Sequence, residues 1–269
     1  MSTIDLTGGY PLDDETIDSF RAHGHTVVRG LASAEEIEAL APVIVEQGTE
    51  RAYDTRPLEE RDTYGKAFLQ SFNLWRTDPR IEAFVFAPRF AEVAARLLGV
   101  EGVRLYHDQG LFKEPGGGPT PWHQDGYYWP LDTERTITLW MPRVDTAEIG
   151  TMTFASGSHV LPDLRGPQIS DASQELFERA LRERGLPLET HGPLAAGDAT
   201  FHAGWVVHSA PANPTGRMRP VMTVIYVDAA ARVATEITKG QVLDHKVWLG
   251  GLPPGSPLDD ERNPVLWPA

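Results

Sequence analysis

Residues 103–112 read VRLYHDQGLF, and the turn cluster PGGGP follows at 115–119. The pattern of the chain changes at this point, because β-branched and aromatic residues then recur in short runs separated by turn residues. We expect the β-prone runs to be Val103–Phe112, Thr136–Met141, Thr151–Phe154, Ala199–His202 and Val221–Val227. A mainly β fold with flanking helices, a double-stranded β-helix of the jelly-roll or cupin-like kind, fits this order best.

The residues before this point read as helices. Asp13 and Asp14 precede a helical pattern that ends at Gly24, and an extended run, His25–Arg29, follows. Ser33 and Glu36 have the spacing of a capping box at the start of a second helix. One or two further helices are expected over Asp78–Leu98, ending at Gly99.

No linker, internal repeat or low-complexity tract divides the chain, so we expect a single domain over residues 1–269. It would have a helical N-terminal part at about 1–100, a jelly-roll core at about 101–230 and a C-terminal tail at about 231–269. A helical insert is expected at Asp171–Arg184, and Pro253–Ala269 is rich in proline and glycine.

Composition limits the possible partners. The chain has no cysteine, so disulfides, thiolate nucleophiles and iron–sulfur clusters are excluded, and a metal must be bound by His and carboxylates. The formal net charge of −14 argues against nucleic acid and anionic membranes as partners. The first ten residues show no signal-peptide pattern, and no run approaches the roughly 18 apolar residues of a membrane span. We therefore expect a cytoplasmic protein that acts on a small molecule.

One of the nine histidines stands two residues before an aspartate, in His123-Gln124-Asp125. On a β-strand, residues i and i+2 point to the same face, so a strand here would aim an imidazole and a carboxylate at one point. This is how a single strand can present two ligands of a two-His, one-carboxylate iron site. The motif alone is weak, because chance occurrence is common in a chain with this many His and Asp residues.

A third ligand and a cation are also needed. The segment from Gly197 to His208 contains two candidates, His202 and His208, and Arg219 lies eleven residues after His208. A guanidinium can hold a carboxylate through two parallel hydrogen bonds, so Arg219 or the nearby Arg217 could anchor a dicarboxylate.

Three passages resemble the phytanoyl-CoA dioxygenase family of Fe(II)/2-oxoglutarate-dependent oxygenases. They are KEPGGGPTPWHQD at 113–125, GTMTFASGSH at 150–159, and HSAPAN at 208–213 followed by Arg219. Their order and spacing cover roughly residues 14–228, which is most of the chain.

The resemblance implies that His123, Asp125 and His208 are the metal ligands and the catalytic centre. It favours His208 over His202, because the family places the distal His eleven residues before the co-substrate Arg. It also implies that Arg219 holds 2-oxoglutarate, with Gln109 and Trp140 beside it. The cofactors would be Fe(II), 2-oxoglutarate as co-substrate, and O₂.

The family chemistry couples oxidation of 2-oxoglutarate to attack on a C–H bond of a second substrate. From the resemblance we expect a small apolar or polycyclic natural-product intermediate, with hydroxylation, epimerisation, cyclisation or desaturation as possible outcomes. Because Asp125 occupies the position that halogenating relatives leave to chloride, halogenation is not expected. The alternatives are a cupin-like metalloenzyme without 2-oxoglutarate, which would not need Arg219, and a non-catalytic binding relative. The oligomeric state is not determined.

Several further residues have two interpretations at this point. His107 and Asp108 are neighbours, so on a strand they point to opposite faces, and His107 is not expected to contact iron. His159 is expected to be structural rather than a ligand. The aromatic segment Gly126–Trp129 either packs in the core or walls a substrate pocket, and with Phe68–Leu74 it is expected near the mouth of the barrel.

Overall fold

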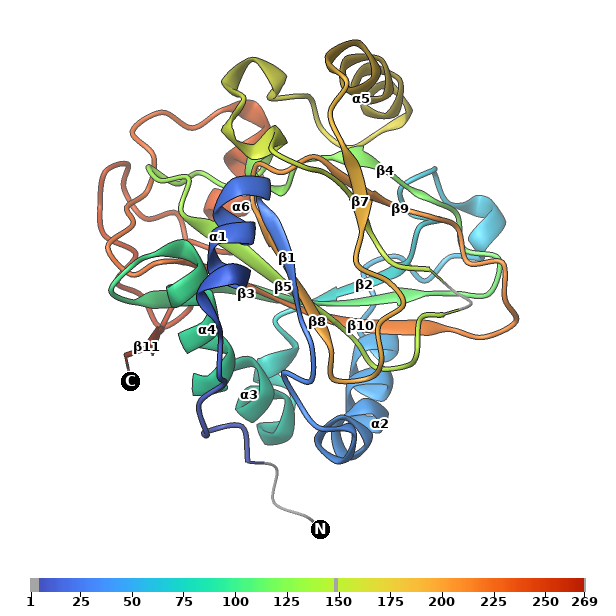
Figure 1. Ribbon diagram of the computed structural model, residues 1–269, viewed down its shortest axis with the longest axis horizontal. Coiled ribbons are helices and arrows are strands. Elements are labelled where there is room, and N and C mark those ends of the chain that lie inside the picture. Colours follow the sequence, from blue (N-terminus) through green and yellow to red (C-terminus); the bar gives the residue numbers. More distant parts are fainter. Residues whose placement is uncertain (1–4, 148–149, 269) are drawn as a thin grey trace.

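Two antiparallel sheets form the centre of the protein in a computed structural model that describes residues 5–147 and 150–268 (Figure 1). The larger sheet has the order β1 (His25–Val28), β8 (Ala199–Ala203), β5 (Thr136–Pro142), β10 (Arg219–Asp228), β3 (Val103–Lys113) and β11 (Val265–Trp267), with β2 (Leu69–Phe72) also paired to β3. The smaller sheet has the order β4 (Thr120–His123), β9 (His208–Ala210), β6 (Thr153–Ala155) and β7 (Leu188–Thr190). The expected jelly-roll fold is confirmed.

Helices cover the outer face of the larger sheet. They are α1 (Asp14–His23), α2 (Ala34–Glu50), α3 (Pro79–Val85) and α4 (Pro88–Leu98), while α5 (Asp171–Arg184) and α6 (Val242–Val247) lie elsewhere (Figure 1). Short 3₁₀ turns are η1 (Leu58–Glu60), η2 (Leu74–Arg76), η3 (Asp125–Tyr127), η4 (Ser158–Val160), η5 (Pro162–Leu164) and η6 (Lys239–Gln241).

The helix ends follow the local sequence signals. The Asp13 side chain accepts a hydrogen bond from the Thr16 amide at the start of α1, and Gly24 ends the helix with φ 82°. Ser33 and Glu36 form the expected reciprocal capping box at the start of α2. The expected helix region at 78–98 is two helices, because Pro88 starts a new one at its first position.

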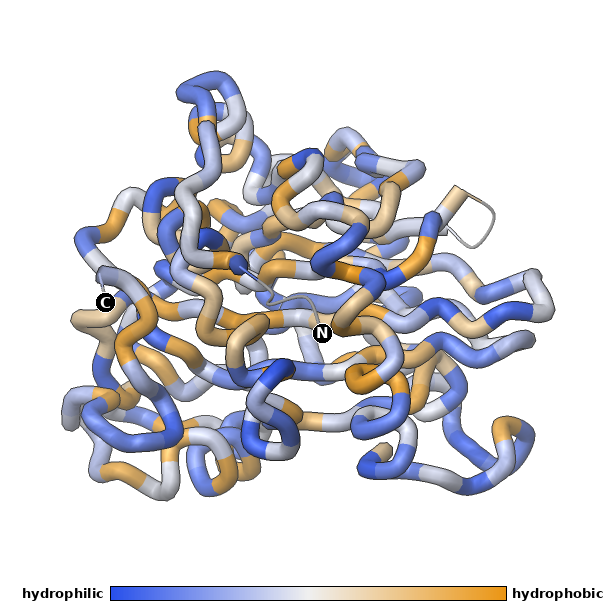
Figure 2. The backbone as a smooth tube through the Cα atoms, turned by 90° about the horizontal axis from the view of Figure 1, so that it is seen from below, coloured by the Kyte–Doolittle hydropathy of each residue, from blue (hydrophilic) through white to orange (hydrophobic). Residues whose placement is uncertain are grey.

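Along the central strands β3, β5 and β10, successive side chains point alternately toward the core and toward the site. Thr223 of β10 lies opposite Gln109 of β3 and Trp140 of β5, and Ile225 lies opposite His107 and Thr138. These residues all face one cavity. Their neighbours, such as Leu139 and Val224, point the other way into the core beneath the helices. Figure 2 shows apolar residues mainly toward the middle of the molecule and polar residues on much of its periphery.

Five short strands that the sequence did not predict are present among the described residues: β2, β4, β7, β9 and β11. β2 lies within the part expected to be helical, and β11 lies within the C-terminal tail; both pair with β3. Each is too short for a period-two pattern to stand out, and β3 supplies the hydrogen-bond partners that make them strands. β4 follows the turn cluster at 115–119 directly. None of the helices among the described residues has the length and apolar content needed to cross a membrane.

Candidate metal centre

His123 and His208 face each other across the smaller sheet. His123 is the last residue of β4, His208 is the first of β9, and the two are paired in the register of the sheet. Their ring centroids are 4.1 Å apart. Because directly opposed residues of an antiparallel pair project to the same side, both imidazoles point from the smaller sheet toward the larger one.

Backbone carbonyls set the tautomer of both rings. His123 Nδ1 lies 2.8 Å from the Pro121 carbonyl oxygen, and His208 Nδ1 lies 3.1 Å from that of Val206. A carbonyl only accepts hydrogen bonds, so each Nδ1 carries the proton and each Nε2 keeps a free lone pair. Metal-binding histidines are commonly oriented in this way by a second hydrogen bond.

Asp125 completes the group, but not from a strand. The strand ends at His123, and Asp125 starts the 3₁₀ turn η3, so the expectation that one strand carries both residues is wrong. The turn is stabilised by Gly126, whose amide donates to the Gly204 carbonyl at 2.7 Å and whose missing Cβ would lie 2.7 Å from the Trp205 ring. The turn still brings the carboxylate to the two imidazoles.

The two carboxylate oxygens of Asp125 have different partners. Oδ1 faces the ligand histidines, 3.6 Å from His123 Nε2 and 3.9 Å from His208 Nε2. Oδ2 accepts hydrogen bonds from His202 Nε2 and from the Thr138 hydroxyl, each at 3.2 Å. One nitrogen or oxygen from each of His123, Asp125 and His208 lies within 4.8 Å of the others. Two imidazole nitrogens and one carboxylate oxygen on one side of a cavity are the donor set of non-haem Fe(II) sites, and the residues present fit that ion.

Electrostatics favour the metal-binding protonation states. Burial lowers the pKa of both His123 and His208, so both rings are neutral at physiological pH. Burial acts to raise the pKa of Asp125, but the adjacent imidazoles of His208 and His202 outweigh it and hold the pKa below its usual range. Neutral imidazoles and an ionised carboxylate are what a divalent cation requires.

His202, the other candidate for the distal ligand, lies on β8 next to Thr138 of β5. It is buried, and its Nε2 is used in the hydrogen bond to Asp125. Its Nδ1 has no partner among the described residues. This arrangement favours His208 as the ligand and makes His202 a residue that holds the Asp125 carboxylate in place.

Arg219 and Arg217 differ in their exposure to solvent. Arg219 is the first residue of β10 and only 2% exposed, whereas Arg217 is on the surface. Arg219 Nη1 donates to the Gly150 carbonyl at 3.0 Å, and its guanidinium lies over the Trp140 ring, 5.2 Å from the centroid. Burial lowers the pKa of Arg219 to about 10, which leaves it charged at neutral pH. Its Nε has no hydrogen-bond partner, and no ion pair of Arg219 is found among the described residues. A buried cation in this state fits a carboxylate ligand.

Gln109 and Trp140 lie at the same end of the cavity as Arg219. Both belong to the row of cross-strand neighbours around Thr223, and Trp140 is almost fully buried. The Gln109 side-chain oxygen accepts a hydrogen bond from Gln70 Nε2 of β2 at 3.2 Å. The unexpected strand β2 thus holds one of the expected co-substrate residues.

A cavity of about 630 Å³ connects the triad with Arg219. Its size is that of a small-molecule site. His107 lines this cavity but is not part of the metal group, in line with its expected distance from iron. Tyr128 and Trp129 both line it as well, and Trp129 also packs in the core, so the two interpretations of this segment are both partly right. The rule that adjacent side chains face opposite ways does not apply, because these residues follow a 3₁₀ turn.

Two segments form the mouth, and sequence reasoning missed them except for Phe68, which was expected there. One is the loop at residues 51–68, which places Tyr53, Tyr64 and Phe68 on the cavity. The other is α6 and the residue after it, which contribute Leu243, Asp244, Val247 and Trp248. The only sequence signal at α6 is the apolar pair Val242–Leu243 in a polar region, and these side chains are 56% and 68% exposed. Exposed apolar residues of this kind often mark a binding surface.

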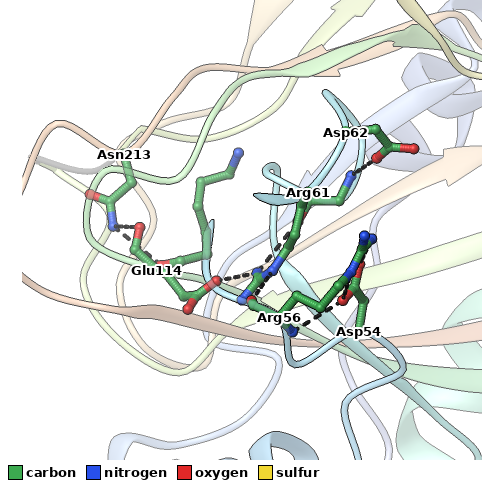
Figure 3. Close-up of polar contacts among 8 residues, drawn as sticks. Asp54, Arg56, Arg61, Asp62, Glu114 and Asn213 are labelled. Atoms are coloured by element: carbon green, nitrogen blue, oxygen red, sulfur yellow. Dashed lines mark hydrogen bonds and ion pairs between the residues drawn. The ribbon is translucent and has the colours of Figure 1, made fainter. Parts of the chain in front are cut away.

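The loop at 51–68 is attached to the turn that follows β3. Figure 3 shows Arg61 reaching Glu114, with 2.5 Å between Nη1 and Oε2, and the Arg61 side chain is only 3% exposed. The Gly118 amide donates to the Lys66 carbonyl at 2.8 Å. Asn213 holds the other side of the same turn through the Glu114 carbonyl (Figure 3). Glu114 and Asn213 belong to two of the motifs quoted above, and here they fix one wall of the cavity.

His159 lies on η4, outside the cavity lining, with its ring against the backbone of Gly24 at the end of α1. The structure therefore does not bring it to the metal group.

Comparisons with known proteins agree with this geometry. The sequence profile of the family described as Phytanoyl-CoA dioxygenase (PhyH) matches residues 20–221. A "Probable alpha-ketoglutarate-dependent hypophosphite dioxygenase" of Stutzerimonas stutzeri is 28% identical over 158 residues, which are 56% of this chain and 54% of the relative. The match thus spans about half the length of that curated relative.

Two solved structures resemble nearly the whole chain. One is the non-heme alpha ketoglutarate dependent carbocyclase SnoK from nogalamycin biosynthesis, with 26% identity, a TM-score of 0.79, and coverage of 96% of this chain and 99% of SnoK. The other is the epimerase SnoN in complex with Fe3+, alpha ketoglutarate and nogalamycin RO, with 27% identity, a TM-score of 0.78, and coverage of 94% and 98%.

Proposed function

Because the chain belongs to the phytanoyl-CoA dioxygenase family, we propose that it is an Fe(II)- and 2-oxoglutarate-dependent oxygenase that activates a C–H bond of a small apolar or polycyclic natural-product intermediate. The observation that carries the proposal is that the His123–Asp125–His208 group and Arg219, which has no ion pair among the described residues, open onto one cavity. Metal donors alone would fit many enzymes. A buried cation on the same cavity points to a dicarboxylate co-substrate.

In this proposal His123 Nε2, Asp125 Oδ1 and His208 Nε2 hold Fe(II). When bound together with 2-oxoglutarate and O₂, iron supplies oxidising power sufficient to break a C–H bond, with succinate and CO₂ as co-products. Arg219 binds the far carboxylate of 2-oxoglutarate through its guanidinium, with Trp140 and Gln109 as walls. Because the three protein ligands lie on one side of the cavity, the opposite side is open to small molecules.

The rest of the cavity orients the substrate and keeps water out. Tyr128, Trp129, Phe72 and Trp248 present apolar rings to it. Which product forms depends on which carbon these walls hold near the metal, so hydroxylation, epimerisation, cyclisation and desaturation are all compatible with the same triad. SnoK and SnoN, which share the fold at similar identity, are named as a carbocyclase and an epimerase.

Location and partners are part of the same proposal. A net charge of −14 supports a small-molecule substrate rather than nucleic acid or an anionic membrane, and the protein is proposed to be cytoplasmic. The single-domain reading of residues 1–269 is supported by strands from both chain ends pairing into the larger sheet.

Calorimetry under anaerobic conditions tests the proposal before any substrate is known. The protein should bind about one Fe(II), and 2-oxoglutarate should bind much more tightly with metal than without it. In air, slow succinate release should require both. Tight metal binding with no affinity for 2-oxoglutarate would instead support a cupin-like metalloenzyme. No metal binding at all would support a non-catalytic relative.

With a substrate in hand, isotopically labelled O₂ would separate the outcomes. A labelled product means hydroxylation, whereas an unlabelled isomer or dehydrogenated product means epimerisation, cyclisation or desaturation. Chlorinated product in the presence of chloride would contradict the role assigned to Asp125.

A further inference from the structure

Asp244 is a carboxylate on the cavity wall, and no cationic partner for it is found in the described part of the chain. It lies in the middle of α6 and lines the cavity. The Tyr106 hydroxyl donates to its Oδ2 at 3.3 Å, and the Trp248 side chain provides a second hydrogen bond. No ion pair of Asp244 is found among residues 5–147 and 150–268, and no Lys or Arg acts on its pKa. A half-buried carboxylate without a cationic partner is costly to keep ionised unless something supplies the missing charge.

Two aromatic side chains, Tyr106 and Trp248, hydrogen-bond this carboxylate, and both rings lie beside that of His107. The Trp248 ring lies 4.8 Å from that of His107 and 5.1 Å from that of Phe72, and Tyr106 lies 5.1 Å from His107. Phe72, His107 and Trp248 line the same cavity as Asp244. A carboxylate among aromatic rings is the arrangement that binds organic ammonium groups, because the ring faces attract cations and the carboxylate neutralises them.

The Asp244 end of the cavity is electrostatically coupled to the triad. The charge of Asp125 contributes to raising the pKa of Asp244. The cavity also has Asp54 and Asp62 at its wall, and Asp54 is paired with Arg56 at 2.6 Å. The only other Arg lining the described cavity is Arg219, at the co-substrate end.

We infer that Asp244, with Phe72, His107 and Trp248, recognises a protonated amine on the substrate, so that the substrate is an apolar, ring-containing organic cation. This inference rests on the proposed function, since it names the substrate class of the same site. The two ends of the cavity then bind groups of opposite charge: Arg219 binds the dicarboxylate, and Asp244 binds the ammonium group.

A neutral partner explains the site less well. Burial raises the pKa of Asp244 to about 7, so without a ligand the group is close to half protonated at neutral pH. A protonated carboxyl could donate to a carbonyl group of a neutral substrate. That alternative makes no use of the rings around it, and it does not benefit from the net charge of −14, which attracts cations to the mouth.

Three probes with one ring system and different charges test the inference. Anthracenylmethylamine is a cation, anthracenylmethanol is neutral, and anthracene carboxylic acid is an anion. Their binding is measured by energy transfer from tryptophan, anaerobically, with Fe(II) and 2-oxoglutarate present so that no turnover occurs. We expect the amine to bind roughly 10- to 100-fold more tightly than the alcohol, as for a hydrogen bond to a charged group. This order of affinities is measured on the unaltered protein.

The variant Asp244→Asn keeps the shape and removes the charge. It should bring the amine to the level of the alcohol while leaving alcohol binding unchanged. Glu236→Gln removes one charge from an exposed position outside the cavity lining and should leave the preference intact. Asp54→Asn, at a carboxylate already paired with Arg56, should change it by less than about 3-fold.

The results that would overturn the inference differ from those that would overturn the proposed function. Equal binding of amine and alcohol by the unaltered protein, a preference for the acid, or no binding of the amine overturns the inference. So does an equal loss of all three probes in Asp244→Asn, which would make the residue structural. Failure of the proposed function is seen separately, as loss of Fe(II) or 2-oxoglutarate binding in the calorimetry of the unaltered protein.

Discussion

The two ends of the cavity are built from different kinds of structure. At one end Arg219, Trp140 and Gln109 belong to β10, β5 and β3, which are neighbours in the middle of the larger sheet. Nine of the ten residues of β10 are buried. At the other end Asp244 belongs to α6, a helix of six residues, none of them buried. The loop at 51–68 faces α6 across the mouth without regular strand or α-helix of its own.

The difference separates shared chemistry from substrate choice. Co-substrate and metal need fixed geometry, and paired strands with a packed outer face provide it. Substrate recognition varies among enzymes of one fold, and loops or short helices at the mouth can change without disturbing the sheet. Substitutions at the two ends should therefore have different effects, and the following predictions rank them from the largest to the smallest.

The largest effect is expected at the metal. His208→Ala should lower Fe(II) binding beyond detection and turnover to background, because three ligands act as a unit. Calorimetry and succinate release measure the two quantities. His202→Ala is the matched comparison, since it removes a neighbouring buried imidazole that is not in the metal group and should lose only part of the Fe(II) affinity. Metal binding that survives in His208→Ala and disappears in His202→Ala would show that the distal ligand is His202.

The next largest effect is expected when the buried guanidinium of Arg219 is removed. Arg219→Ala should raise the dissociation constant for 2-oxoglutarate by roughly 30-fold or more, as expected when one partner of a buried charge pair is removed. Titration of the Fe(II) protein measures this, and Fe(II) affinity itself should stay unchanged. Arg217→Ala, two residues away and exposed, should shift the constant by less than about 3-fold. The reverse pattern would assign the co-substrate to Arg217.

A smaller effect on Fe(II) affinity is expected for His202, because it acts on the metal only through the ligand Asp125. His202→Ala should lower Fe(II) affinity by about 10-fold, because it releases Asp125 Oδ2 and lets the carboxylate turn. His202→Gln, which keeps an N–H donor near that position, should recover most of the loss. A purely structural role would lower the melting temperature in both variants and leave Fe(II) affinity unchanged in the folded fraction.

The smallest effect on folding is expected at the mouth. Leu243→Ala on α6 should change the free energy of unfolding by no more than about 0.5 kcal/mol, because the side chain is 68% exposed. It should nevertheless weaken binding of the anthracenyl probes by a few fold through lost apolar contact. Leu139→Ala on β5, fully buried, should cost about 2–5 kcal/mol. Similar stability losses in both, measured by denaturant unfolding, would remove the distinction between the two ends.

Much of the fold follows from local signals. The caps at Asp13, Ser33, Gly24 and Gly99 predict helix ends that the structure contains, because a cap depends on a few neighbouring residues. The long strand β3 is likewise visible as a β-prone run. The strands β2, β4, β7, β9 and β11 were missed, since a segment of three or four residues becomes a strand only when a partner offers its hydrogen bonds.

The metal-binding motif was found for a reason that is only partly right. A strand over His123-Gln124-Asp125 would place both side chains on one face, whereas the strand ends at His123 and a turn brings Asp125 round. The choice of His208 and Arg219 came from resemblance to a family. The structure adds physical support: a carbonyl at His208 Nδ1, a hydrogen bond that occupies His202, and burial of Arg219 but not Arg217.

The sequence by itself determined the helix caps, the β-rich core, the absence of thiol chemistry and the identity of the side chains that could bind iron, because these depend on composition and on contacts within a few residues. Only the tertiary structure decided which oxygen of Asp125 faces the metal, that β2 holds Gln109, and that Asp244 and Arg219 share one cavity. Those relations join residues far apart in the chain. Their energies come from burial and from hydrogen bonds across the two sheets, and neither is encoded in local sequence.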